Sequence, residues 1–275
     1  ATAELDRDEQ RIDAWDEQDD GTRRGSEFRA LDDGIGLEAQ IVGEEVDATF
    51  EARADLDSRQ TSPDQSVNMY NRFGGIEVVA LRHMEFEGEF ELPDGTETLS
   101  GSCYFQRVCF DVPLFPWKWI WAIFPDGTSF SVMIPFVGPQ LFRRGYKFFS
   151  SNTLERLTVP VRQSGFWHWG TDDSRVSFDR ATVEPNLHAS GHPNFEVRAE
   201  NDDGDYVSFE ADTYGHARNW LDRLKLGGRF ESHWSYNEFM FQMNDLSGRV
   251  SGQSISEDKL GDAFGTLEYS TGLSF

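Results

Sequence analysis

Two Pro-Asp-Gly tripeptides, at residues 93–95 and 125–127, constrain the fold of this chain more than any other feature of its sequence. Each stands between two segments with the residue pattern of β-strands, which are residues 83–92 and 96–112, and residues 117–124 and 128–136. Proline fixes φ, aspartate hydrogen-bonds to its own backbone, and glycine supplies the positive φ that a short hairpin turn requires. The sequence therefore predicts two successive β-hairpins in the middle of the chain.

The rest of the chain has the pattern of many short strands separated by turns. One amphipathic helix is expected among them in the second half, capped by Asp212 or Thr213 and ended by Gly227 and Gly228. Its apolar positions recur at helical spacing and are Ala217, Trp220, Leu221 and Leu224. A single helix among many strands predicts an all-β protein, either a barrel or a sandwich.

The sequence divides into two comparable halves near residue 150, within Ser150-Ser151-Asn152. We expect an N-terminal β domain over residues 1–150 and a C-terminal β domain over residues 151–275. Nine of the first twenty residues are Asp or Glu, so the first 25 residues are expected to be acidic and loosely ordered.

The charge of the chain limits its partners. It has 49 acidic and 25 basic residues, a formal net charge of -24, and only four of the basic residues are lysines. Such a field repels phosphates, which argues against nucleic acid as a partner. The carboxylates of such a surface repel one another unless salt screens their charges. In 1 M salt the screening distance, the Debye length, is about 3 Å. This composition is typical of proteins from extreme halophiles and predicts an acidic surface.

Cysteine usage and hydropathy indicate the compartment. Cys103 and Cys109 fall in one expected strand, too far apart along it to bridge each other, which fits a reducing cytosol. The start of the sequence lacks the pattern of a signal peptide. The longest apolar stretch, residues 108–124, is interrupted by charges and prolines and is too short to span a membrane. We therefore expect a soluble, cytoplasmic protein with no membrane span.

Trp117, Trp119 and Trp121 recur at every second position, so a strand would project all three indoles onto one face. Such a row either fills a core or forms the wall of a site for an apolar ligand, because flat indoles offer large contact area and can stabilise a passing cation. Both interpretations remain open at this level.

The layout around this row is recognisable. Its parts are the segment 101–111, the Trp-rich segment 115–119, the turn at 125–127, and the glycine-led segments 248–252 and 265–269. The layout resembles the two-domain lipocalin-like family of hydroxyneurosporene synthase, also called carotenoid 1,2-hydratase, and its AttH-type relatives. The resemblance spans residues 70–275. It implies two lipocalin-like antiparallel β-barrels side by side, in a family that includes hydratases and cyclases of isoprenoid or polyketide substrates.

The chain departs from that family at the proton-handling motif. Where the family carries an Asp/His cluster, this sequence has Gln106 and Arg107, and neither side chain can protonate a double bond. A general acid would instead be a carboxyl of raised pKa set among aromatic residues. The candidates are Glu268, which stands at the family's closing-strand glutamate, then Asp111, and also Glu231 and Glu238.

Other residues complete the candidate site. His233 would share a strand face with Glu231 and is a catalytic candidate, while Tyr104, Gln106 and Arg107 are expected to join the indole row in ligand binding. His188 and His192 flank a segment with Gly191 that reads as a loop, so we expect no metal site. The sequence has no phosphate-binding loop, nucleophile elbow or paired CxxC, so no cofactor is expected.

These observations leave three functional hypotheses. The first is a lipocalin-like protein that binds an apolar small molecule such as an isoprenoid, a carotenoid or another lipid. The second is a cofactor-independent hydratase or cyclase acting on an isoprenoid-type substrate. The third is a structural or partner-binding protein with filled barrels. All three require the same abundance of aromatic residues, so the sequence separates them poorly, and the absence of an acid at Gln106 and Arg107 favours the first.

Overall fold

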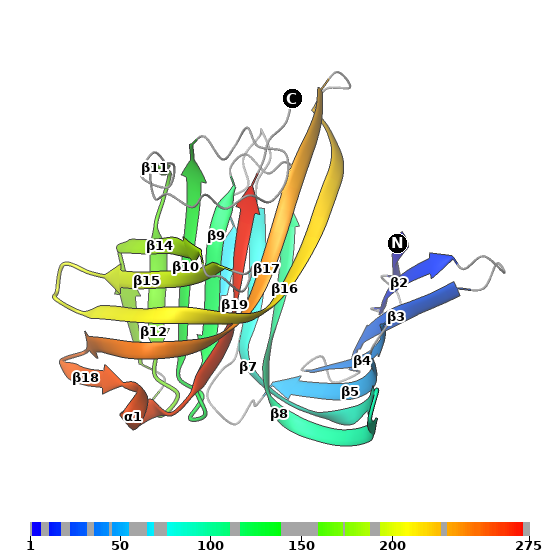
Figure 1. Cartoon of the computed structure of the whole chain (residues 1–275), viewed down its shortest axis with the longest axis horizontal. Helices are drawn as coiled ribbons and strands as arrows, with labels where there is room; N and C mark the ends of the chain where they lie inside the picture. The colour runs from blue at the N-terminus through cyan, green and yellow to red at the C-terminus, as the bar shows by residue number, and fades with distance from the viewer. Residues whose placement is uncertain are drawn as a thin grey trace. The chain divides into compact units, whose positions relative to one another are not determined.

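The computed structural model describes residues 2–6, 11–17, 23–31, 36–43, 46–54, 65–68, 76–110, 116–138, 159–172, 174–187, 193–226 and 230–271. Nearly all of them lie in β-strands, which confirms the all-β prediction (Figure 1). The chain divides into two compact units, Ala1–Asp111 and Val112–Phe275. The division falls after Asp111 and not near residue 150, because strands from both sides of residue 150 pair within one sheet.

The first unit is an eight-stranded antiparallel sheet in the order β1-β2-β3-β4-β5-β7-β6, with β8 paired to the other edge of β7. Its strands are β1 (Thr2–Asp6), β2 (Arg11–Glu17), β3 (Arg23–Ala30), β4 (Gly36–Val42), β5 (Asp47–Ala54), β6 (Gln65–Asn68), β7 (Ile76–Leu92) and β8 (Gly95–Phe110). Both cysteines lie in β8, as predicted. The described residues of this unit form one sheet and show no second barrel.

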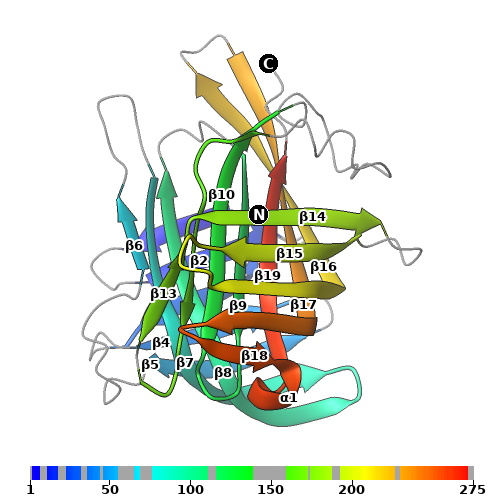
Figure 2. The same cartoon turned by 90° about the vertical axis from the view of Figure 1, so that its left-hand side faces the viewer.

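The second unit is an eleven-stranded antiparallel sheet that curls into a nearly closed barrel (Figure 2). The strand order is β13-β12-β10-β9-β19-β17-β16-β15-β14, with β11 paired to β10 and β18 to β17. The elements are β9 (Trp117–Ile123), β10 (Ser129–Val137), β11 (Val159–Pro160), β12 (Ser164–His168), β13 (Arg175–Phe178), β14 (Arg180–Leu187), β15 (Pro193–Glu200), β16 (Tyr206–Leu226), β17 (Phe230–Val250), β18 (Gln253–Ser256), α1 (Glu257–Leu260) and β19 (Ala263–Thr271).

Both predicted hairpins are present. Strands β7 and β8 close at the pair Leu92 and Gly95, and strands β9 and β10 close around Gly127, whose N–H bonds to the carbonyl of Phe124 at 3.0 Å. The two turn glycines have φ of 137° and 80°, values that favour glycine. In the second turn Asp126 accepts a hydrogen bond of 2.9 Å from the backbone N–H of Thr128. Both turn glycines, and Asp126 in the second turn, therefore act as the turn chemistry requires.

The predicted amphipathic helix is wrong. Residues 206–226 form strand β16, which pairs with β17 in a long antiparallel hairpin, and α1 is the only helix in the described part of the chain. The pairing has register shifts at Ser208/Glu210, Thr213/Gly215 and Asp222/Leu224. The first shift adds a residue to β17 and the other two each add a residue to β16. Ala217, Trp220 and Leu221 lie within the unbroken pairing from Gly215 to Asp222, so their helical spacing is overridden by pairing with β17.

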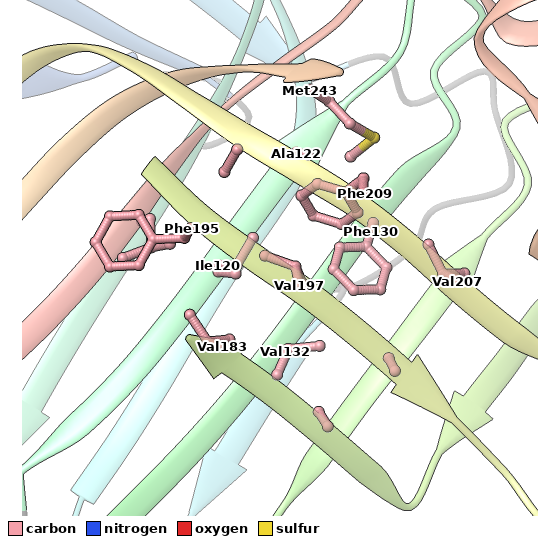
Figure 3. Packing of buried hydrophobic residues seen from close by; sticks show 14 of the residues in the cluster. Ile120, Ala122, Phe130, Val132, Val183, Phe195, Val197, Val207, Phe209 and Met243 are labelled. Atoms are coloured by element: carbon pink, nitrogen blue, oxygen red, sulfur yellow. The ribbon is translucent and has the colours of Figure 1, made fainter. Parts of the chain in front are cut away.

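The hydrophobic core of the second unit lies inside the barrel (Figure 3). Ile120 and Ala122 of β9 and Phe130 of β10 meet Phe195 and Val197 of β15 across it. These side chains occupy alternate strand positions, as expected where one face of a sheet is buried. In β9, however, every residue from Trp117 to Ala122 is buried, so its outward-facing side chains are buried as well.

Candidate functional site

Trp117, Trp119 and Trp121 project from the face of β9 opposite the barrel core, as the strand period predicts. Their side chains are 6%, 4% and 0% exposed. The rings of Trp119 and Trp121 lie 6.0 Å apart, and Trp121 meets Phe166 of β12 edge-on at 5.9 Å. We call these four residues the indole face. It is a buried aromatic surface on the face of β9 that points away from the barrel core.

Glu268 lies on this same side of the wall. In β19 it alternates with the core residues Leu267 and Tyr269, and it pairs directly with Trp119 on β9. The indole Nε1 of Trp117 donates a hydrogen bond of 2.9 Å to its Oε2 atom. The side chain is 6% exposed. The sequence named Glu268 as its first candidate acid, and the structure places it against two of the three predicted indoles.

The strand pairing that aligns these residues is reinforced by a serine that sequence reasoning missed. The backbone N–H of Trp117 donates to Oγ of Ser270 at 2.6 Å, and the Ser270 hydroxyl donates back to the carbonyl of Trp117 at 3.2 Å. Ser270 is fully buried. These two bonds hold the start of β9 against the end of β19, and so fix the indole of Trp117 near the carboxyl of Glu268.

A second carboxyl faces the first. Glu238 of β17 is the direct cross-strand neighbour of Glu268. Burial raises the pKa of Glu268 to about 7, the charge of Glu238 adds to the rise, and hydrogen bonds from Tyr236 and Trp117 oppose it. Burial also raises the pKa of Glu238. The Glu268 carboxyl can therefore both hold and release a proton near neutral pH, as a general acid must.

The other predicted site residues belong to other strands or fall outside the described residues. Tyr104, Gln106 and Arg107 are in β8 of the first unit, where Tyr104 and Gln106 are half-buried. The Oε1 atom of Gln106 is buried without a hydrogen-bond partner among the described residues. His233 lies in β17, with its backbone paired to Asp222, and Asp111 falls outside the described residues.

Lys118 is a further buried residue that our sequence reasoning missed. It stands between two indoles in the sequence, but alternation turns its side chain to the barrel interior, where it is buried. The signal was available in the strand period, since a lysine at the even position of a strand with indoles at the odd positions must occupy the other face.

Within the described residues, no three His, Cys, Asp or Glu side chains converge on a common point suited to a metal ion. The described part of the chain also holds no helix with the length and apolar character needed to span a bilayer.

No known family model and no curated protein sequence matches this chain. Similar solved structures include a protein described as AttH from Nitrosomonas europaea, with 13% identity and a TM-score of 0.48 over 90% of this chain and 68% of that one. CghA with Sch210972 has 10% identity and a TM-score of 0.46 over 96% and 74%. Kievitone hydratase from Nectria haematococca has 9% identity and a TM-score of 0.37 over 95% and 88%.

Proposed function

We propose that the indole face of the second unit binds an apolar unsaturated molecule, such as an isoprenoid, a carotenoid or another lipid, and that Glu268 adds a proton to it. The protein is then a cofactor-independent hydratase or cyclase. One observation carries the proposal: the buried Glu268 carboxyl is held by the indole of Trp117 beside the aromatic row. A carboxylic acid in apolar surroundings keeps its proton near neutral pH, which protonation of a double bond requires.

The proposed step begins with the protonated Glu268. The π electrons of a substrate double bond take its proton and form a C–H bond, which leaves a carbocation on the neighbouring carbon and a carboxylate on Glu268. The faces of Trp119 and Trp121 can stabilise that cation electrostatically. In a hydration, water forms the new C–O bond and returns a proton to Glu268. In a cyclisation, a second double bond of the substrate attacks in place of water, and the new cation then loses a proton to the Glu268 carboxylate, which forms a C=C bond and restores the acid.

Glu238 has a defined part in this cycle. When Glu268 is ionised, two facing carboxyls cannot both be charged at low cost, so a proton released by the attacking water is held between them. Tyr236 and Trp117 donate hydrogen bonds to the ionised Glu268 and so limit how far its pKa rises. The pKa of Glu268 thereby stays near neutral pH, where the carboxyl can both give and take a proton quickly.

The test compares the wild type with Glu268→Gln, which keeps the side-chain shape and removes the proton. Glu196→Gln, at an exposed carboxyl on β15, is the matched control. Each protein is incubated with lycopene or farnesol in H₂¹⁸O and molar KCl, and products are followed by mass. We expect labelled hydrate or an isomeric cyclised product from the wild type and the control, and a loss of about 10²-fold or more in Glu268→Gln. Equal product from Glu268→Gln would contradict the assigned role.

Binding without conversion is the second candidate function. It is favoured by Gln106 and Arg107, which supply no acid at the position where the resembled family carries one. The same incubation separates the two functions, because a pure binding protein retains the ligand in all three forms and forms no product. Mass spectrometry of an organic extract of protein purified from its native host identifies a ligand that the indole face retains.

A further inference from the structure

The barrel interior carries a buried amine that the proposed reaction does not use. Lys118 is 4% exposed and its Nζ donates a hydrogen bond of 2.6 Å to the backbone carbonyl of Val183. The ammonium position lies 5.1 Å from the ring centroid of Tyr269 and 5.7 Å from that of Phe136. Lys118 is the second residue of β9, and Phe136 is the last but one of β10, so the amine lies near one end of the barrel.

Further polar side chains continue from this amine across the neighbouring strands. Tyr269 of β19 is the cross-strand partner of both Lys118 and Asn237 of β17. Asn237 is fully buried and donates a hydrogen bond of 2.9 Å to the carbonyl of Tyr269. His216 of β16 lies 3.4 Å from Oδ1 of Asn237 and stacks on Phe239, a core residue. A polar group is thus set into the otherwise apolar interior at this end.

The charge state of Lys118 follows from these surroundings. Burial lowers its pKa to about 7, and Glu184 on β14 opposes the shift through its negative charge. At pH 7 about half of the Lys118 amines are therefore neutral, compared with about one in three thousand for an amine at the ordinary value of 10.5. A neutral amine has a free electron pair and is a nucleophile toward carbonyl carbon.

We propose that the Lys118 end of the barrel interior is a binding site for an apolar aldehyde or ketone, and that Lys118 captures the carbonyl carbon as an imine. The placement of a buried amine beside Tyr269, Phe136 and the Val183 carbonyl supports this assignment. Aromatic rings suit an apolar ligand body and can also stabilise a cationic iminium.

The chemistry balances without any other reagent. The nitrogen lone pair forms a C–N bond to the carbonyl carbon, and the oxygen takes a proton to give a carbinolamine. Loss of water then forms the C=N bond, and uptake of one proton gives the iminium. The iminium keeps one N–H, which can go on donating to the carbonyl of Val183. The hydrogen bond of Lys118 to the Val183 carbonyl is therefore compatible with both the unmodified amine and the iminium product.

This site is independent of the proposed hydratase chemistry. Lys118 and Glu268 lie on opposite faces of the barrel wall, so the carbonyl site can be present whether or not Glu268 protonates a substrate. The variant Glu268→Gln is expected to retain carbonyl capture at Lys118, and its loss of turnover has no bearing on Lys118.

Four lysines make the test direct, because every adduct can be assigned by peptide mapping. The folded protein is treated at pH 7 with decanal and sodium cyanoborohydride, which reduces an imine to a stable secondary amine. Lys259 is the internal control: its Nζ also donates to a backbone carbonyl, that of Ser254, but its side chain is exposed. We expect at least about tenfold more decyl adduct on Lys118 than on Lys259.

Lys118→Arg keeps the charge and removes the nucleophile, so it should lose that adduct while labelling of Lys259 is unchanged. If this variant does not fold, Lys118→Met serves the same purpose. The comparison of Lys118 with Lys259 in the wild type tests the proposal even if neither variant folds. Glyceraldehyde, a polar aldehyde, should modify Lys118 at least about tenfold less than decanal does. A wild-type protein modified at Lys259 but not at Lys118 overturns the proposal, and equal modification of Lys118 by both aldehydes overturns the apolar ligand class.

Discussion

The indole N–H of Trp117 donates a hydrogen bond of 2.9 Å to the carboxyl of Glu268, although the two residues are 151 positions apart in the chain. The contact exists because β9 and β19 are neighbours in the barrel wall and because both side chains turn to the same face. It joins the aromatic row to the buried acid. Without this hydrogen bond, the aromatic row and the buried carboxyl would each be an ordinary feature of a β-protein.

The stability of the fold should depend on pH through Glu268. Its folded pKa of about 7 lies above the ordinary 4.5, so the folded state binds the proton more tightly, and stability falls as pH rises from 4.5 to 7. Glu268→Gln should remove this loss, which amounts to about 3 kcal/mol at most. Urea melts of both proteins between pH 4.5 and 8 measure the difference. Parallel curves for the two proteins would show that Glu268 titrates normally.

Lys118 should produce the opposite slope at higher pH. Its folded pKa of about 7 lies below the ordinary 10.5, so the unfolded chain binds more protons and stability rises from pH 7 to 10.5. Lys118→Met should flatten this rise while lowering stability at every pH through the unpaired carbonyl of Val183. The same melts, extended to pH 10.5, give the shape of the curve. A constant offset between the two proteins across this range contradicts the depressed pKa.

The indole face should contribute strongly to stability. Trp119→Ala is expected to reduce the free energy of unfolding by about 3–5 kcal/mol, because the lost transfer free energy and the cavity add. Tyr214→Ala is the matched control: its ring is 63% exposed, and its loss should change stability by less than about 0.5 kcal/mol. Denaturant melts compare the two. A small effect of Trp119→Ala would mean that the row is not packed.

Salt should stabilise the protein. A net charge of -24 with only four lysines leaves the folded chain under strong self-repulsion, which molar salt screens. We expect a clearly higher melting temperature in molar KCl than in millimolar KCl, measured by circular dichroism. Equal midpoints would rule out adaptation to high salt.

Local features of the fold were predictable from the sequence, and nonlocal ones were not. The turns at Gly95 and Gly127 follow from the chemistry of three consecutive residues, so both hairpins could be predicted. The division after Asp111 depends on β9 pairing with β19, which no local pattern encodes. The helix predicted over β16 did not form, because pairing with the distant strand β17 decides the structure of this segment and the local apolar spacing does not.

The site was predictable in its parts and not in its assembly. Strand period placed Trp119 and its neighbours on one face, and the aromatic setting of Glu268 marked it as a candidate acid. Their proximity could not be read from the sequence, because it depends on the strand order of the barrel. In the sequence, Lys118 stands out only as a charge within an apolar stretch, although the same period that aligns the indoles turns it inward.

Infrared difference spectra, wild type minus Glu268→Gln, test most directly whether the Glu268 carboxyl holds a proton near neutral pH. A protonated carboxyl has a C=O stretching band that is absent from both the carboxylate and the amide. We predict that this band is present at pH 5, falls to half its intensity near pH 7, and is absent at pH 9. A carboxylate already formed at pH 5 would contradict the assignment of Glu268 as the general acid.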